Sequence, residues 1–208
     1  MQRLMKIEEP LNHIMGIFFA IAPSAFVQQL FAVHCGVVPS GQLRLLGRST
    51  DEELHLKNMT QPDFAFDGRE SFLTIEAKID SGSGVDQLVK YATLHQKAAL
   101  KSPGRQHALL FLASKPQNKL FKEGKTEWSD MRELAKSQLT NESLQSPEKF
   151  TAESLQSISF MIDTLKLGYM NFADLGSALE RQVQASANAE ENNLYRGLQF
   201  ELKRRVLC

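Results

Sequence analysis

The sequence has very little cysteine. Its two cysteines, Cys35 and Cys208, lie far apart along the chain. Disulfide-stapled secreted domains and zinc-binding modules both need several cysteines at short, regular spacings. The sequence therefore excludes a disulfide framework and a zinc finger, and it favours a reducing, cytoplasmic setting.

An excess of charge of either sign is also missing. The 208 residues include 24 Lys and Arg against 24 Asp and Glu, with 42% apolar and 23% charged residues. This composition excludes a disordered chain and a globally basic nucleic-acid coat. Any polyanion would have to bind at a local basic patch. The length is sufficient for one domain with a substantial core.

Long hydrophobic runs are scarce. The apolar run at 14–22 is much shorter than the ~18 uninterrupted apolar residues of a membrane span. Arg3 and Lys6 precede it and Pro-Ser-Ala follows it, as in a signal peptide. However, Glu8 and Glu9 lie where a signal peptide should be basic. We therefore expect an ordinary buried helix and no membrane partner.

Local patterns predict helices around several strands. Apolar residues recur at helical spacing over 8–34, where Pro23 can begin a second helix, and again over 85–100. Residues 42–50 are an expected first strand. The run at 107–114 is almost entirely apolar, which is typical of a strand covered on both faces.

A hairpin is the clearest local prediction. Two β-prone runs, 61–66 and 71–79, flank Asp67-Gly68, which is a strong hairpin turn signal. Alternating Ser and Gly at 81–84 then interrupt the chain before the next helix. A sheet with flanking helices gives an α/β layer fold.

The C-terminal part is expected to be helical. Helical patterns cover 126–139 and 153–168, and an amphipathic segment ends the chain. Ser, Gln and Asn are frequent at 137–147 and 182–193, the expected connectors. We therefore predict a core over 1–136 and a helical extension over 137–208, packed on the core as one domain.

The strand over 72–80 carries the most informative charges. Side chains alternate along a strand, so Glu76 and Lys78 share one face. The opposite face is purely apolar and belongs to a core: Leu73, Ile75, Ala77 and Ile79. Asp63 lies thirteen residues before Glu76 on the partner strand. Hairpin pairing can therefore bring two carboxylates and one lysine together.

Two carboxylates with free positions around them suit Mg²⁺ or Mn²⁺, which also bind phosphate oxygens and water. A nearby lysine can orient or help to deprotonate a water, or stabilise negative charge on the phosphate. Metal-assisted phosphodiester hydrolysis is the reaction class that follows. On these three residues alone, a surface Glu–Lys pair beside a turn aspartate is an equally good interpretation.

Pro62-Asp63, followed by Glu76-Ala77-Lys78 at the end of an apolar strand, resembles the signature of the PD-(D/E)xK nuclease superfamily. Gln87 and Tyr91 match the QxxxY element of RecB-like members, and positions four apart share a helix face. The resemblance covers about residues 8–115. It implies a restriction-endonuclease-like core, with a central mixed β-sheet flanked by helices, and catalytic roles for these matched residues: Asp63, Glu76, Lys78, Gln87 and Tyr91.

The resemblance also implies an acidic metal ligand on the first core helix. Glu9 is the preferred equivalent, ahead of Glu8, so that the expected metal ligands are Asp63, Glu76 and Glu9. An equally good interpretation is that acidic residues before Pro10 cap a helix N-terminus and interact with its dipole. His13 is retained as a site neighbour, although such a histidine is more often half-buried and structural.

Basic residues after the last expected strand form a candidate phosphate-contacting patch. It contains Lys115, Lys119, Lys122 and Lys125, to which Lys90, Arg44 and Arg48 could add. A solvated loop is the alternative. Basic residues at 203–205 suit a helix C-terminus. Trp128 could stack on a base, but it is more often a core anchor.

The sequence therefore predicts a nuclease that uses Mg²⁺ or Mn²⁺, with DNA as the expected nucleic acid. The alternative is a nuclease-like fold that binds nucleic acid or protein without catalysis. Because one chain carries one site, a symmetric homodimer would help to cut both strands, and this remains a hypothesis.

Overall fold

The computed structural model describes residues 2–47, 61–79, 82–144 and 150–206. The strands are β1 (Leu43–Leu45), β2 (Phe64–Gly68), β3 (Ser71–Lys78), β4 (Gln106–Ala113) and β5 (Lys166–Asn171). The helices are α1 (Gln2–Ile21), α2 (Ser24–Cys35), α3 (Val85–Lys101), α4 (Trp128–Ser137), α5 (Asn141–Leu144), α6 (Ala152–Thr164), α7 (Phe172–Ala185) and α8 (Ala189–Arg205), with a short 3-10 turn, η2 (Gln117–Lys119).

The five described strands form one mixed sheet in the order β1-β2-β3-β4-β5. Strands β1, β2 and β3 pair antiparallel, whereas β3, β4 and β5 pair parallel. Helix α3 makes the crossover from β3 to β4, as a parallel pair requires. The prediction of an α/β fold with a central sheet flanked by helices is confirmed.

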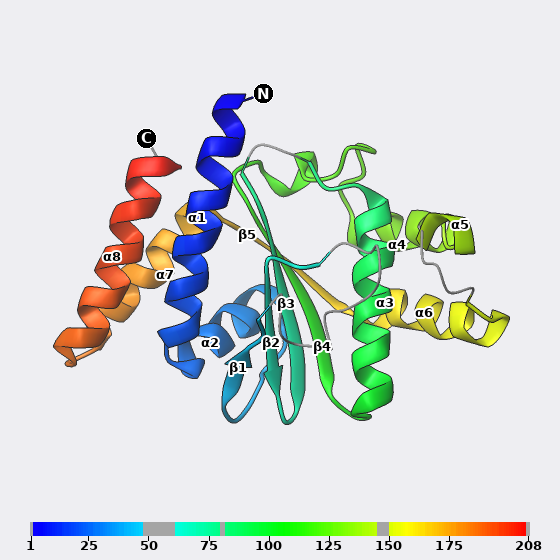
Figure 1. The fold of residues 1–208 in the computed structure, drawn as a ribbon, viewed down its shortest axis with the longest axis horizontal. Helices are drawn as coiled ribbons and strands as arrows, with labels where there is room; N and C mark the ends of the chain where they lie inside the picture. Colours follow the sequence, from blue (N-terminus) through cyan, green and yellow to red (C-terminus); the bar gives the residue numbers. More distant parts are fainter. Residues whose placement is uncertain (1, 48–60, 80–81, 145–149, 207–208) are drawn as a thin grey trace.

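Helices cover both faces of the sheet (Figure 1). On one face, α1, α2, α7 and α8 pack over the largest apolar cluster, which includes Phe18, Phe66 and Ile75. On the other face, α3, α4, α5 and α6 pack over a second cluster, which includes Leu109 and Phe111. Strands β3 and β4 are therefore buried on both sides, and this explains why 107–114 is so apolar.

The N-terminal apolar run forms part of this core. Leu11, Met15, Phe18 and Phe19 are buried at helical spacing in α1, and α2 follows directly after Pro23, as predicted. No single helix in the described part of the chain is long and apolar enough to cross a membrane. The segments Glu9–Ile21 and Ser24–Cys35 meet those limits only as a pair, and they are bent by 113°.

The predicted hairpin exists, but its turn is not at Asp67-Gly68. The register pairs Phe66 with Leu73 and Asp67 with Phe72, which leaves Arg69 and Glu70 as the turn. Gly68 ends β2 because β1 crowds it: a Cβ built there would lie 2.8 Å from Leu43 Cδ2. This glycine allows close packing of two strands and does not supply a turn conformation.

The expectation of an entirely helical C-terminal region was wrong for residues 166–171. They form β5, which pairs parallel with β4 from Ala108 to Ala113. Gly168 lets β5 approach α2, since a Cβ there would lie 2.5 Å from the carbonyl oxygen of His34. The sequence boundary at residue 136 therefore does not coincide with a boundary in the sheet.

The later of the two predicted connectors, at 182–193, is much shorter than its polar composition suggested. Helix α7 continues to Ala185 and α8 begins at Ala189, so only 186–188 connect them. The earlier connector contains α5 and, in part, residues outside the described ranges. The first strand was expected over 42–50, and β1 occupies 43–45 of it, while 48–50 lie outside the described residues.

Candidate active site

Strand β3 separates apolar and polar side chains onto its two faces, as the alternation predicted. Leu73, Ile75 and Ala77 point into the cluster under α1 and α2. Glu76 points to the other face, under α3, and is only 3% exposed. Lys78 ends the strand on that same face, where its side chain is 13% exposed. The charged pair therefore lies at the C-terminal ends of β3 and β4, where Lys78 is more exposed than Glu76.

Both carboxylate oxygens of Glu76 have hydrogen-bond donors. Lys78 Nζ lies 2.5 Å from Oε1, and the Tyr91 hydroxyl donates to Oε2. Burial and the nearby negative charge of Asp63 nevertheless raise the pKa of Glu76 to about 7, because Lys78 and Tyr91 offset only part of these effects. Burial is therefore the main reason that Glu76 keeps its proton to a higher pH than an exposed carboxyl group does.

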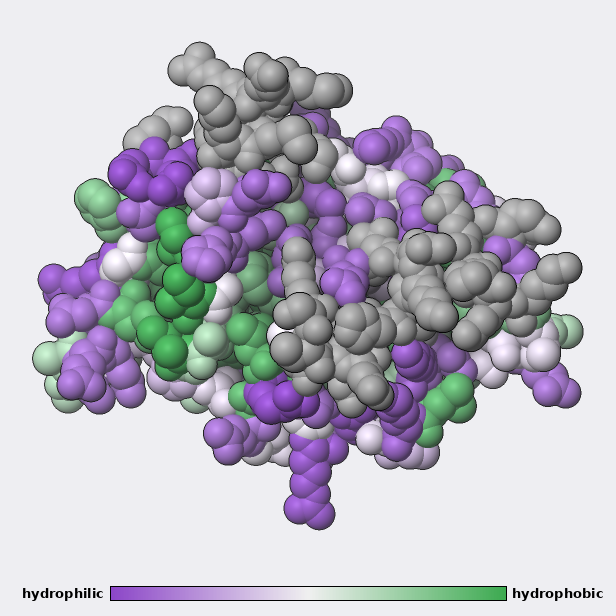
Figure 2. Space-filling model, viewed as in Figure 1, coloured by the Kyte–Doolittle hydropathy of each residue, from purple (hydrophilic) through white to green (hydrophobic). Residues whose placement is uncertain are grey.

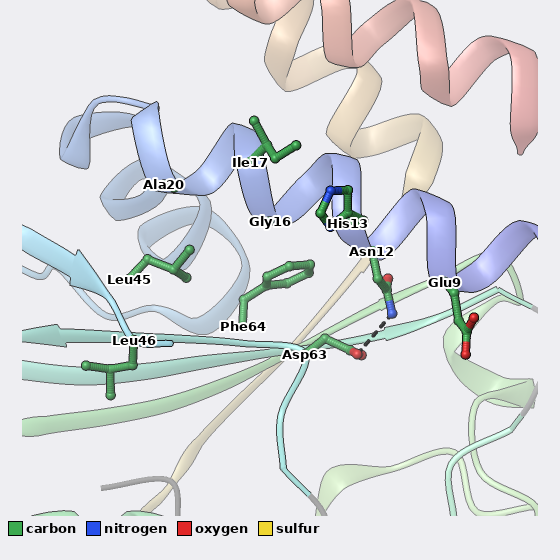
Figure 3. Close-up of a pocket in the computed structure, with 10 residues that line it drawn as sticks. All are labelled: Glu9, Asn12, His13, Gly16, Ile17, Ala20, Leu45, Leu46, Asp63 and Phe64. Carbon is green, nitrogen blue, oxygen red and sulfur yellow. Dashed lines mark hydrogen bonds between the residues drawn. The ribbon is translucent and has the colours of Figure 1, made fainter. Parts of the chain in front are cut away.

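Asp63 lies beside Glu76 because of the strand register. Phe64 pairs with Ile75, so Asp63, one residue before β2, reaches the Glu76 end of β3. Its Oδ2 accepts a hydrogen bond from the main-chain nitrogen of Ala77 at 2.8 Å. Its Oδ1 accepts from Asn12 Nδ2 at 3.0 Å (Figure 3). The hairpin and α1 together fix this carboxylate.

Helix α3 contributes the expected Gln87 and Tyr91. Tyr91 is fully buried and contacts Glu76, whereas the Gln87 side-chain oxygen is buried without a hydrogen-bond partner in the described structure. The helix N-terminus is held in place by Glu123, whose carboxylate accepts from Val85 N at 3.1 Å. The polar residues Gln87 and Tyr91 of α3 therefore lie over the charged face of β3.

The α1 residues line a cavity next to this cluster. Glu9, Asn12, His13 and Asp63 line one part of a cavity of about 550 Å³ between α1 and strands β1 and β2, and apolar side chains such as Phe64 line the rest (Figure 3). Glu9 and His13 are exposed. The Glu8 side chain lies outside the described part of the chain. Sequence reasoning missed Asn12, which is the α1 residue that contacts Asp63.

The alternative role of Glu8 and Glu9 as helix caps was wrong. Helix α1 begins at Gln2 and continues through Pro10, so neither residue lies at a helix N-terminus. Asn12 lies three residues after Glu9, on a neighbouring part of the same helix face, but no local pattern in the sequence marks it as the partner of Asp63. Its side chain also suits the position, because an amide can donate to a carboxylate without adding charge.

The oxygen donors of the site are few. No group of three or more His, Cys, Asp or Glu side chains in the described ranges is arranged to hold a metal ion. Asp63 and Glu76 alone are compatible with Mg²⁺ or Mn²⁺, because these ions bind through one or two carboxylates and keep several waters. A bound cation would favour the charged form of Glu76 and so oppose the effect of burial on its pKa.

The predicted basic residues separate into three groups. Lys115, Lys119, Lys122 and Lys125 are exposed, and none of them has an ion-pair partner within the described ranges. We call these four residues the lysine rim. Lys90 is only 8% exposed and lies 3.4 Å from Asp86, while Arg44 lies 3.9 Å from Asp67. Arg48 lies outside the described residues.

The lysine rim lies at the same end of the sheet as Lys78, beyond the C-terminal end of β4. The rim segment follows Ala113, which pairs with Lys78 in the parallel register. Ser83 N donates to the carbonyl of Leu120, and Lys122 N donates to the carbonyl of Ser83. Trp128, by contrast, stacks on Phe111 with ring centroids 5.9 Å apart and is a core anchor. Arg204 and Arg205 pair with Glu201 near the end of α8.

Comparisons with known proteins do not assign the chain to a family. No family model matches the sequence, and no match was found among curated proteins or among solved structures.

Proposed function

We propose that this chain is a metal-dependent nuclease with a restriction-endonuclease-like core, which hydrolyses phosphodiester bonds of nucleic acid and preferably of DNA. The observation that carries the proposal is the convergence of Asp63, Glu76 and Lys78 at the open end of β3. Three antiparallel strands followed by an α3 crossover to a parallel strand support the fold assignment.

Asp63 and Glu76 would hold the Mg²⁺ or Mn²⁺ ion, with Glu9 as a candidate further donor from α1. When bound, the ion supplies Lewis-acid polarisation of the phosphate and a water of lowered pKa. Tyr91 keeps Glu76 oriented through its hydroxyl. Lys78 places a positive charge beside the two carboxylates, where it can orient a water and stabilise charge that develops on the phosphate.

The lysine rim supports a polyanionic substrate. Four exposed lysines follow β4 at the end of the sheet where Lys78 lies, and none of them has an ion-pair partner among the residues that the structure describes. They give a surface that attracts phosphates. Such contacts supply affinity that is independent of sequence. Lys90 contributes less to this surface than its position in the sequence suggested, because it is buried against Asp86.

One observation favours the alternative of a non-catalytic binding module. Glu76 already has a donor on each oxygen, from Lys78 and Tyr91, so the pair resembles a buried structural ion pair. In that case the lysine rim would still bind nucleic acid, but no phosphodiester bond would be cut. Activity and binding must therefore be measured separately.

The deciding experiment incubates the purified chain with linear, circular and single-stranded DNA and with RNA, in Mg²⁺ or Mn²⁺. Glu76→Gln and Lys78→Met keep the side-chain size and remove the charge. Each should lower the cleavage rate by about 10³-fold, as expected for groups that act on the transition state. Glu190→Gln is the matched control, because Glu190 is exposed in the first turn of α8, which packs on the opposite face of the sheet from α3.

Equal cleavage by the wild type and both site variants would identify a contaminating nuclease and refute the catalytic assignment. Binding of DNA by the wild type without any cleavage would favour the binding module. Cleavage lost in Glu190→Gln as well would show that the variants fail for reasons of folding, which circular dichroism would reveal.

A further inference from the structure

Asn12 connects helix α1 to the Asp63 carboxylate. Asn12 Nδ2 donates to Oδ1 at 3.0 Å, and Ala77 N donates to Oδ2 at 2.8 Å (Figure 3). An ionised carboxylate only accepts hydrogen bonds, so the nitrogen side of the amide must face it. Donors from two separate elements, α1 and β3, therefore fix the orientation of one carboxylate group.

The helix that carries Asn12 is itself held in place. Leu11 and Met15 on either side of Asn12 are fully buried in the core. Further along α1, the Phe19 ring packs on the Phe64 ring, with the two ring centroids 5.0 Å apart. Phe64 is the residue after Asp63, so the α1–β2 contact fixes both ends of the hydrogen bond. The backbone of Asn12 therefore keeps a fixed position relative to Asp63.

The other side of the Asn12 amide indicates a role beyond packing. Its Oδ1 is buried and has no hydrogen-bond partner in the described parts of the chain. A buried amide oxygen without a partner costs folding free energy. An apolar residue of similar size would avoid that cost, so the hydrogen bond to Asp63 is the feature that distinguishes asparagine here. Glu9, one turn earlier, is exposed at the cavity and makes no hydrogen bond to Asp63 in the described structure.

We propose that Asn12 is the positioning residue of this site, which holds the Asp63 carboxylate in the orientation that binds the divalent cation. The inference rests on the proposed function, because it gives α1 a part in cation binding. The sequence resemblance attributed the part of the first helix in cation binding to Glu9, and the inference attributes it to Asn12. Asn12 acts through Asp63 and does not need to touch the substrate.

Cation binding tests this role without relying on cleavage. Mn²⁺ binding would be measured by titration calorimetry for the wild type, Asn12→Leu and Asn12→Ala, with Glu76→Gln as the reference for a lost ligand. Asn12→Leu keeps a similar volume and removes the donor. Its Mn²⁺ dissociation constant should rise about 10-fold or more, as for other residues that orient a metal ligand. For DNA cleavage, kcat should fall while KM stays close to that of the wild type.

Asn192→Leu is the matched control. Asn192 also donates one hydrogen bond, to the carbonyl of Ser186 at 2.9 Å, and also has a buried side-chain oxygen without a partner in the described structure. It lies on α8, away from Asp63. Its substitution should lower the melting temperature as much as Asn12→Leu does, and leave Mn²⁺ binding unchanged.

Three results would overturn the inference. If Asn12→Leu binds Mn²⁺ as the wild type does, while Glu76→Gln does not, the positioning role fails and the proposed function stands. If Asn192→Leu weakens Mn²⁺ binding equally, the effect of Asn12 is a general loss of stability. If the wild type shows no saturable binding of Mn²⁺, both the inference and the metal-dependent function fail.

Discussion

Thr74 and Glu76 lie two residues apart on one face of β3, and both contact α3. Thr74 Oγ1 lies 2.9 Å from His95 Nε2, whose other ring nitrogen is 3.1 Å from His107 Nδ1. We call Thr74, His95 and His107 the histidine cluster. Glu76, Asp63, Lys78 and Tyr91 form the carboxylate cluster. Tyr91 and His95 are four residues apart on α3, so one helix face covers both clusters.

The histidine cluster consists of uncharged groups. Burial lowers the pKa of His95 well below its usual value and lowers that of His107 to about 4, and the nearby Arg105 adds to both effects. Both rings are therefore neutral at pH 7. Arg105 in turn lies 2.5 Å from Asp67 and over the Phe72 ring. Neutral rings avoid repulsion from the Arg105 cation, as expected of polar groups that serve the fold.

The carboxylate cluster differs in the kind of group that is buried. Burial and the charge of Asp63 raise the pKa of Glu76 to about 7, and the Lys78 ammonium offsets only part of that effect. Burial under the same helix favours the neutral form in both clusters, so it raises the pKa of the acid and lowers that of the bases. Perturbed acids of this kind are concentrated at functional sites. The comparison predicts opposite responses of the two clusters to pH.

Glu76 gives the largest expected pH effect. Its folded pKa of about 7 exceeds the ordinary value of 4.5, so its stabilising contribution is complete below pH 4.5 and is lost as the pH rises through 7. In metal-free protein, ionisation of Glu76 should lower the free energy of unfolding by roughly 1 kcal/mol for each pH unit between 4.5 and 7. Urea denaturation of the wild type and of Glu76→Gln at several pH values measures the difference. Parallel pH profiles for the two proteins would contradict it.

His107 should show the opposite and smaller dependence. Its folded pKa lies below the ordinary value of 6.5, so its contribution is present above pH 6.5 and is lost as the pH falls through about 4. Because the side chain is partly exposed, we expect only about 0.5 kcal/mol per pH unit. His107→Gln should flatten the profile between pH 6.5 and 4 in the same denaturation series, with His13→Gln as an exposed control. A steeper profile in His107→Gln would refute the assignment.

The lysine rim gives the smallest effect and tests which end of the sheet meets the substrate. Lys119→Ala combined with Lys122→Ala should raise KM for DNA about 2- to 3-fold and make binding less dependent on salt. Lys166 is the control, because it is exposed at the first residue of β5, at the end of the sheet near His107. Lys166→Ala should leave KM and its salt dependence unchanged. Equal effects of the two sets of substitutions would mean that DNA does not bind preferentially at the end of the sheet that carries the lysine rim.

Much of the site could be predicted because it depends on local periodicity. Alternation along β3 places Glu76 and Lys78 on one face, and helical spacing places Tyr91 over them. Asn12 could not be predicted in the same way. Its contact with Asp63 joins residues 51 positions apart and depends on how α1 packs against β2. The sequence contains no local pattern that reports such packing.

The two errors in the fold have a similar cause. Asp67-Gly68 has the composition of a turn, but Arg105 engages Asp67 and β1 crowds Gly68, so tertiary contacts decide the register. Residues 166–171 follow a helix without a clear break, and a short strand of mixed composition gives little periodic signal. In both places, neighbours distant in sequence outweigh the local preference.

The position of β5 also bears on the order of folding. Its partner β4 is complete at Ala113, but β5 is formed by residues 166–171. During synthesis, β4 therefore has an open hydrogen-bonding edge until more than fifty further residues have left the ribosome. An open apolar edge can pair with other chains. Helices α4, α5 and α6 lie in the interval, but they pack on a face of the sheet, so the hydrogen-bonding edge of β4 is closed only by β5.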